Sequence, residues 1–177
     1  MNKSNTNGFT LIELLVTSSV IVVISTIVIF NTGLERQSSA LFRSAQKLSL
    51  DLRRAQSFSL SSKTYKTTGV PCGWGMHFNG VGSTNYIIFA DLAILSDCSD
   101  RDFIRDGSSA EDFETINLEA GIKVNSLSGS LSDIVFTPPD PVTTFIPVQT
   151  SAAIVLINKN SDTRTVNINK AGLISAQ

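Results

Sequence analysis

The sequence has very little histidine and no surplus of charge among its 177 residues. A single histidine, His77, excludes a metal site built from several histidines and leaves a Ser-His-Asp triad without a choice of base. The formal net charge of −1 argues against a globally basic surface that would recruit nucleic acid. We therefore predict that the protein is not an enzyme and that it binds no cofactor and no metal.

Long apolar runs are also missing, except for one near the N-terminus. Residues 9–30 form a run of 22 residues with one ionisable side chain, Glu13. As a helix this run would be about 33 Å long, which is enough to cross a bilayer core of about 30 Å. A cleaved signal peptide, which would need a shorter apolar stretch, is the weaker alternative. Lys3 precedes the run, so the positive-inside tendency predicts a cytoplasmic N-terminus and an exported C-terminal domain.

Residues 8–16, GFTLIELLV, resemble the type IV prepilin motif. In that family a membrane aspartic peptidase cuts after the glycine and methylates the new N-terminus. The resemblance therefore implies a leader over residues 1–8, cleavage between Gly8 and Phe9, and N-methylation of Phe9. The leader departs from the family pattern because it lacks a basic residue just before the glycine.

Glu13 is an expensive residue for a helix in lipid, since a carboxylate near the bilayer centre costs about 2.5–3.5 kcal/mol. The resemblance implies that Glu13 serves filament assembly by pairing with the Phe9 amine of a neighbouring subunit. The alternative is a position near the membrane interface, where water hydrates the carboxylate.

The residues after the span predict an amphipathic helix over residues 31–62, broken or frayed near Gly33. Apolar residues recur there at helical spacing, at Leu34, Leu41, Ala45, Leu48, Leu52 and Ala55. The helix also carries a basic face, which we interpret as a contact with solvent or with other subunits: Arg43, Lys47, Arg53 and Arg54.

Residues 63–177 predict a β-rich globular domain. Short segments rich in β-branched and aromatic residues alternate with turn residues and predict strands over 73–78, 86–90, 113–118, 122–127, 134–137, 153–158, 164–169 and 172–175. Without intervening helices the sheet should be mainly antiparallel and pack on the amphipathic helix. The predicted fold class is α+β and pilin-like. Segments 72–78, 86–91 and 136–141 resemble stretches of minor pseudopilins and pilins of the GspH/FimT type.

The two cysteines, Cys72 and Cys98, are too few for a metal cluster. Because an exported domain meets oxidising surroundings, we predict a disulfide between them, with two free buried cysteines as the alternative. The bridge would attach an acidic stretch, residues 97–114, to an early strand. We interpret that stretch as a surface loop, since Ile104 and Arg105 do not fit the ligand and glycine positions of an EF-hand.

The resemblance implies a structural subunit, a minor pseudopilin or pilin of a type II secretion pseudopilus or a type IV pilus. Its partners would be prepilin peptidase, other pilin or pseudopilin subunits, the assembly platform and ATPase, and the membrane. The alternative is a minor pilin that binds DNA for uptake. Its cationic patch would come from Lys159, Arg164 and Lys170, although residues 169–174 lack the arginine-flanked glycine of DNA-binding relatives.

Overall fold

The computed structural model describes residues 8–66, 69–92, 98–99, 101–107, 110–138 and 142–177, with the side chains of residues 29–35 left aside. The chain divides into two compact units, residues 1–36 and 37–177. One helix, α1 (Leu11–Leu60), begins in the first unit and ends in the second. It is followed by β1 (Gly73–Phe78), β2 (Asn85–Asp91), β3 (Asp112–Asn117), β4 (Lys123–Leu127), a short 3-10 turn (Ser128–Ser130), β5 (Asp133–Thr137), β6 (Val142–Ile146), β7 (Ser151–Ile157), β8 (Thr163–Asn169) and β9 (Ile174–Ala176).

The C-terminal half of α1 buries the predicted apolar stripe. The side chains of five stripe residues are 2% exposed or less: Leu41, Ala45, Leu48, Leu52 and Ala55. The side chain of Leu34, the first stripe residue, lies outside the described residues. The helix continues through Gly33, so the predicted break there is wrong. One glycine costs a helix about 1 kcal/mol relative to alanine, which a long helix without proline tolerates.

α1 ends at Leu60 in a hydrogen-bonded C-terminal cap. Ser62 adopts a left-handed backbone conformation with φ of 47°. The Lys63 amide then donates to the Phe58 carbonyl at 3.0 Å, and the Ser62 amide donates to the Ser59 carbonyl at 3.0 Å. This is the Schellman pattern, which satisfies carbonyl groups that the last helical turn would leave unpaired.

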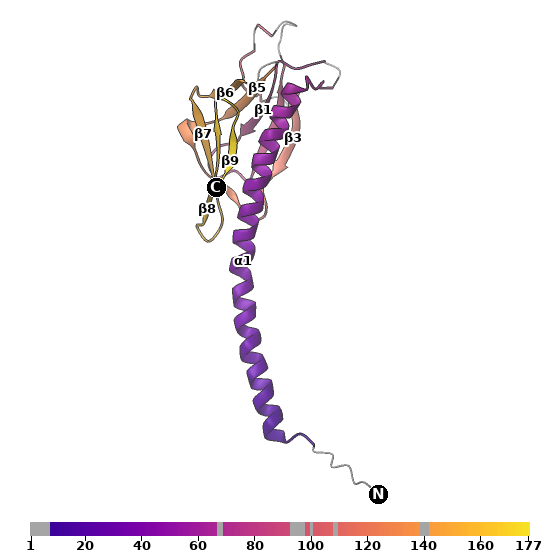
Figure 1. Cartoon of the computed structure of the whole chain (residues 1–177), viewed down its shortest axis with the longest axis vertical. Coiled ribbons are helices and arrows are strands. Elements are labelled where there is room, and N and C mark those ends of the chain that lie inside the picture. The colour runs from indigo at the N-terminus through magenta and orange to yellow at the C-terminus, as the bar shows by residue number, and fades with distance from the viewer. Residues whose placement is uncertain (1–7, 67–68, 93–97, 100, 108–109, 139–141) are drawn as a thin grey trace. The chain divides into compact units, whose positions relative to one another are not determined.

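The strands form two antiparallel sheets around the C-terminal half of α1 (Figure 1). One sheet has the strand order β3-β2-β1-β5-β6, and the other has the order β4-β7-β8-β9. Every strand pair in the described part of the chain is antiparallel. The predicted α+β fold class, with a long N-terminal helix and mainly antiparallel sheets, is confirmed.

Most predicted strands agree with the observed ones to within two residues, but β6 (Val142–Ile146) was missed. Prolines at positions 138, 139, 141 and 147 surround this segment and argue against a strand. The segment is an edge strand, paired only with β5 among the described strands. The prolines flank the strand and none lies inside it, so they remove no hydrogen bond from its interior. The last strand begins at Ile174 rather than residue 172, because Gly172 occupies a turn with φ of 76°.

Aromatic side chains fasten the end of α1 to the five-stranded sheet. Trp74 of β1 is 1% exposed and makes edge contacts with Phe58, Tyr65 and Phe113. Its ring nitrogen donates a hydrogen bond to the Lys63 carbonyl at 3.2 Å. The Trp74 ring therefore acts as a buried anchor of the sheet.

The basic face of α1 is largely exposed, at Arg43, Lys47 and Arg53, which fits the predicted contact with solvent, and its three arginines also have partners in this chain's own domain. Arg43 forms an ion pair with Glu119 at 2.7 Å, and Arg54 forms one with Glu114 at 2.7 Å. Arg53 donates to the Ile174 carbonyl at 3.1 Å. Sequence spacing could not reveal these partners because they lie 60 or more positions away in strands and turns that fold back onto α1.

Candidate functional site

The Gly8-Phe9 junction lies outside regular secondary structure and directly before α1. Phe9 is 79% exposed. A Cβ built on Gly8 would meet no atom within 4 Å, so both sides of the junction are open. A peptidase needs an accessible backbone outside a helix, and the junction offers one. Residues 1–7 of the predicted leader lie outside the described residues.

Thr10 caps the N-terminus of α1 and brings Glu13 into the first turn. The Glu13 amide donates to the Thr10 hydroxyl oxygen at 3.3 Å, and the Leu14 amide donates to the Thr10 carbonyl at 3.2 Å. The Thr-x-x-Glu spacing is the signature of a capping box. The sequence contains this signal, but the predicted helix start did not make use of it. The negative charge of Glu13 also suits the positive end of the helix dipole.

Residues Leu11–Val28 form a helical segment that is long and apolar enough to cross a membrane, judged by length and composition. None of this window is buried inside the protein. Four of its hydroxyl groups are satisfied locally, because Thr17, Ser18, Ser19 and Thr26 each donate to a backbone carbonyl three or four residues earlier. These four hydroxyl groups therefore add little cost to insertion into lipid.

The N-terminal segment also matches a known family model. Residues 3–29 match the prokaryotic N-terminal methylation motif, which is the cleavage signal of type IV pilin-type prepilins. The match fits a type IV pilin-like protein, the class that residues 8–16 predicted from their resemblance. No curated protein and no solved structure gave a significant match to the chain.

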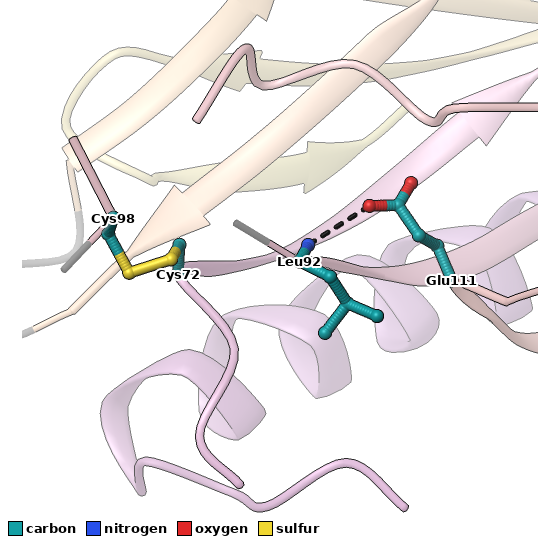
Figure 2. The surroundings of a disulfide bond; sticks show 4 residues. All are labelled: Cys72, Leu92, Cys98 and Glu111. Atoms are coloured by element: carbon teal, nitrogen blue, oxygen red, sulfur yellow. Dashed lines mark hydrogen bonds between the residues drawn. A yellow bond between two sulfur atoms is a disulfide. The ribbon is translucent and has the colours of Figure 1, made fainter. Parts of the chain in front are cut away.

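The structure joins Cys72 and Cys98 in a disulfide, the pairing that the sequence predicted. The two Cα atoms are 5.5 Å apart, and Cys72 is buried just ahead of β1. Its amide donates to the Asp91 carbonyl at 2.9 Å, so the bridge begins at the end of the β1-β2 pair. Figure 2 shows the bridge near Leu92, whose amide donates to a carboxylate oxygen of Glu111 at 3.0 Å.

The acidic stretch is tied to the sheet by its own polar groups as well. Glu111 accepts a second hydrogen bond, from the Asp106 amide at 2.9 Å. Arg105 binds Asp112 through two nitrogens, one of them at 2.8 Å from a carboxylate oxygen. This pair lowers the pKa of the Asp112 carboxyl, because a nearby guanidinium favours the charged form. Sequence alone predicted a surface loop here, and the structure adds that the described loop residues are held against the sheet.

Asp91 is a buried carboxyl beside this loop. It is 1% exposed, and its Oδ2 atom has no hydrogen-bond partner among the described residues. Burial, followed by the charges of Glu111 and Asp102, raises the pKa of Asp91 to about 7, while Arg101 opposes the shift. Burial also raises the pKa of Glu111. The folded protein therefore holds a proton on Asp91 at pH values where the unfolded chain has released it.

We expect the free energy of unfolding to fall between pH 5 and pH 8 because of Asp91. In this window the folded state binds more protons than the unfolded state, so raising the pH favours unfolding. About two pKa units lie between pH 5 and the folded-state pKa of about 7, so at about 1.36 kcal/mol per unit the loss should be about 3 kcal/mol. Denaturant unfolding of the full chain in detergent, followed by the fluorescence of Trp74, measures it. Asp91→Asn should lose most of this pH dependence, and an unchanged dependence in Asp91→Asn would contradict the assignment.

The remaining candidate residues are placed as follows. Nδ1 of half-buried His77 lies 2.7 Å from Oδ1 of Asp133, so the ring is a sheet residue with a carboxyl partner. In the described part of the chain, no three His, Cys, Asp or Glu side chains form a group that could hold a metal ion. Asp97 and Asp100 of the acidic stretch lie outside the described residues.

The three cations of the DNA-binding alternative do not gather in one place. Lys159 lies in the turn between β7 and β8, and Arg164 follows it near the start of β8. Lys170 comes after the other end of β8. Lys170 comes six positions after Arg164, which is about 20 Å along an extended strand. The alternative therefore gains no support from these placements.

Proposed function

We propose that the protein is a filament subunit, a minor pseudopilin or pilin of a type II secretion pseudopilus or a type IV pilus. The observation that carries the proposal is the exposed Gly8-Phe9 junction directly ahead of a capped, apolar helix. The methylation motif over residues 3–29 supports it. In this proposal residues 1–8 are the leader, 9–30 the transmembrane helix, 31–62 the amphipathic helix and 63–177 the exported domain.

The apolar half of α1 would serve two successive environments. Lipid covers it while the subunit waits in the cytoplasmic membrane with its N-terminus on the cytoplasmic side. Prepilin peptidase then removes the leader and methylates Phe9. The assembly ATPase and platform extract the subunit, and neighbouring subunits replace lipid around the helix, where close packing and interhelical hydrogen bonds can stabilise the filament.

Glu13 would guide each subunit into register during that exchange. Removal of the leader creates a positively charged amine on Phe9, one helical turn before Glu13. In a low-dielectric filament core an amine and a carboxylate attract strongly. The pair would form between neighbouring subunits, because each charge entering the core then finds a partner.

Intact-mass analysis of the full chain tests this proposal. In cells with an active prepilin peptidase, the mature protein should lack residues 1–8 and carry one methyl group on Phe9. Gly8→Ile should keep the leader, because a branched side chain would obstruct the peptidase. The protein itself leaves room for a Cβ at position 8, so misfolding would not explain the result.

The matched control is Asn7→Ala, which leaves the glycine in place and should be cleaved normally. Mature protein that still begins at Met1, in cells that process other prepilins, would contradict the proposal. Cleavage of Gly8→Ile at the same junction would contradict the role assigned to the glycine.

A further inference from the structure

A cleft of about 370 Å³ opens at the end of the domain where α1 enters it. It is formed by the start of β4, the end of β7 and the turns beside them, and its lining includes Thr84, Lys123, Lys159 and Ser161. The place of the cleft follows from contacts within the second unit. Ser38 of α1 donates to Asp162 of the β7-β8 turn at 3.1 Å.

The cleft presents two lysines that form no ion pair with any carboxylate in the described part of the chain. Lys123 and Lys159 are exposed, and the ion pairs of the described residues engage other cations. The Lys159 stem lies next to the β3-β4 turn, since its Cε atom is 3.4 Å from a Cβ built on Gly121. Two carboxylates lie nearby, but Glu119 is paired with Arg43 and Asp162 accepts hydrogen bonds from Ser38 and Asn158. Arg43 neutralises Glu119, whereas Asp162 keeps its negative charge, so the two lysines outnumber the unneutralised carboxylate and leave the cleft a net positive charge for a ligand.

The donors of the cleft suit a phosphate group. Two ammonium groups attract its charge, and the hydroxyl groups of Thr84 and Ser161 can donate hydrogen bonds to its oxygens. A nucleic-acid site would need a longer array of cations, because its affinity comes from many phosphate contacts. The cleft offers two lysines, and Lys170 lies at the other end of β8. The chemistry favours a single phosphate.

The chain also limits how far this end of the domain can lie from a membrane. The apolar window ends at Val28, and the second unit begins at Gln37, nine residues later. Nine residues of chain reach at most about 32 Å, whatever their path. The start of the second unit, where the cleft lies, therefore stays within about 32 Å of the end of the apolar window.

From this geometry we infer that the cleft binds the phosphate of an anionic phospholipid head group while the subunit waits in the membrane. The inference rests on the proposed membrane anchor. Lipid contact at Lys123 and Lys159 would hold the stored subunit against the bilayer. Extraction into a filament would then have to break this contact.

The test uses the full chain in nanodiscs made of phosphatidylcholine alone or with added phosphatidylglycerol. Amine acetylation, followed by peptide mass spectrometry, gives the labelling rate of each lysine. We expect labelling of Lys123 and Lys159 to slow about fivefold in the anionic discs. Attraction of about 1 kcal/mol between an anionic surface and each nearby lysine corresponds to about this factor in an equilibrium. The effect should shrink at high salt, and Lys170 should label equally in both kinds of disc.

Two further arms separate the sources of phosphate and the role of charge. Slower labelling with inorganic phosphate in neutral detergent, and no effect of anionic discs, would overturn the lipid assignment in favour of a small-anion site. The double variant Lys123→Gln/Lys159→Gln should retain fewer phosphatidylglycerol molecules in native mass spectrometry. The control Lys66→Gln/Lys170→Gln removes the same charge elsewhere and should retain as many as the unmodified chain.

Failure of this inference can be told from failure of the proposed function. A chain that enters the discs but shows equal labelling of Lys123 and Lys159 in both lipids contradicts the head-group site alone. A chain that does not enter discs contradicts the membrane anchor and this inference with it.

Discussion

Glu13→Gln should enter filaments at least tenfold less than the unmodified chain, while its membrane insertion and leader removal stay intact. The substitution removes a charge but keeps the shape of the side chain. Insertion should not suffer, because a neutral amide costs less in lipid than a carboxylate. In the assembled state the Phe9 amine would lose its partner, and an unpaired buried charge costs several kcal/mol. Each 1.4 kcal/mol corresponds to about tenfold in an equilibrium.

The measurement is a competition within one cell. Tagged Glu13→Gln and unmodified protein are expressed at equal levels, and their ratio is compared between membranes and sheared filaments. Thr10→Ala is the matched control for the local structure, because it removes the helix cap seen at the Glu13 amide and keeps the carboxylate. Equal incorporation of Glu13→Gln would refute the intersubunit role of Glu13. An equal loss with Thr10→Ala would assign the effect to the helix start instead.

Removing the disulfide should lower the stability of the globular domain by several kcal/mol. For Cys72→Ser/Cys98→Ser we expect the free energy of unfolding to fall by about 3.5 kcal/mol, the chain-entropy value for a bridge that closes 26 residues. The loss arises mainly in the unfolded chain, which gains freedom when the link is absent. Denaturant unfolding of the full chain in detergent, followed by Trp74 fluorescence, gives the value.

Reduction supplies the control for this variant. A reductant should lower the stability of the unmodified chain to that of the double variant and should leave the variant unchanged. Equal stability of the two oxidised proteins would contradict the expected contribution. Two freely alkylatable thiols in filament-derived protein would show that the bridge does not form in the exported domain.

The hydrogen bonds of Glu111 suggest how the loop would respond to the loss of the bridge. Its carboxylate still holds the amides of Leu92 and Asp106 when the cysteines are gone. We therefore expect the double variant to remain folded below its unfolding transition, with the change confined to its stability.

The local pattern of side chains determined much of this protein. The apolar spacing in α1 and the β-branched and aromatic segments between turn residues are short-range signals, since each depends on residues close together in the chain. The same holds for the apolar window and the cleavage motif, which depend on consecutive residues. The capping pair Thr10 and Glu13 is a signal of the same kind, because its spacing alone marks the start of a helix.

Only the tertiary structure decided the features that depend on residues far apart in the chain. The partners of Arg43 and Arg54 lie in the β domain. The prolines around β6 argued against a strand there, and only the sheet topology shows that β6 is an edge strand, where flanking prolines are tolerated. Charge composition could not show that Lys159 and Lys170 lie at opposite ends of β8, or that Lys123 joins Lys159 at one cleft. Sequence periodicity fixes which face of an element is buried, whereas the folded path of the chain fixes which distant side chains meet.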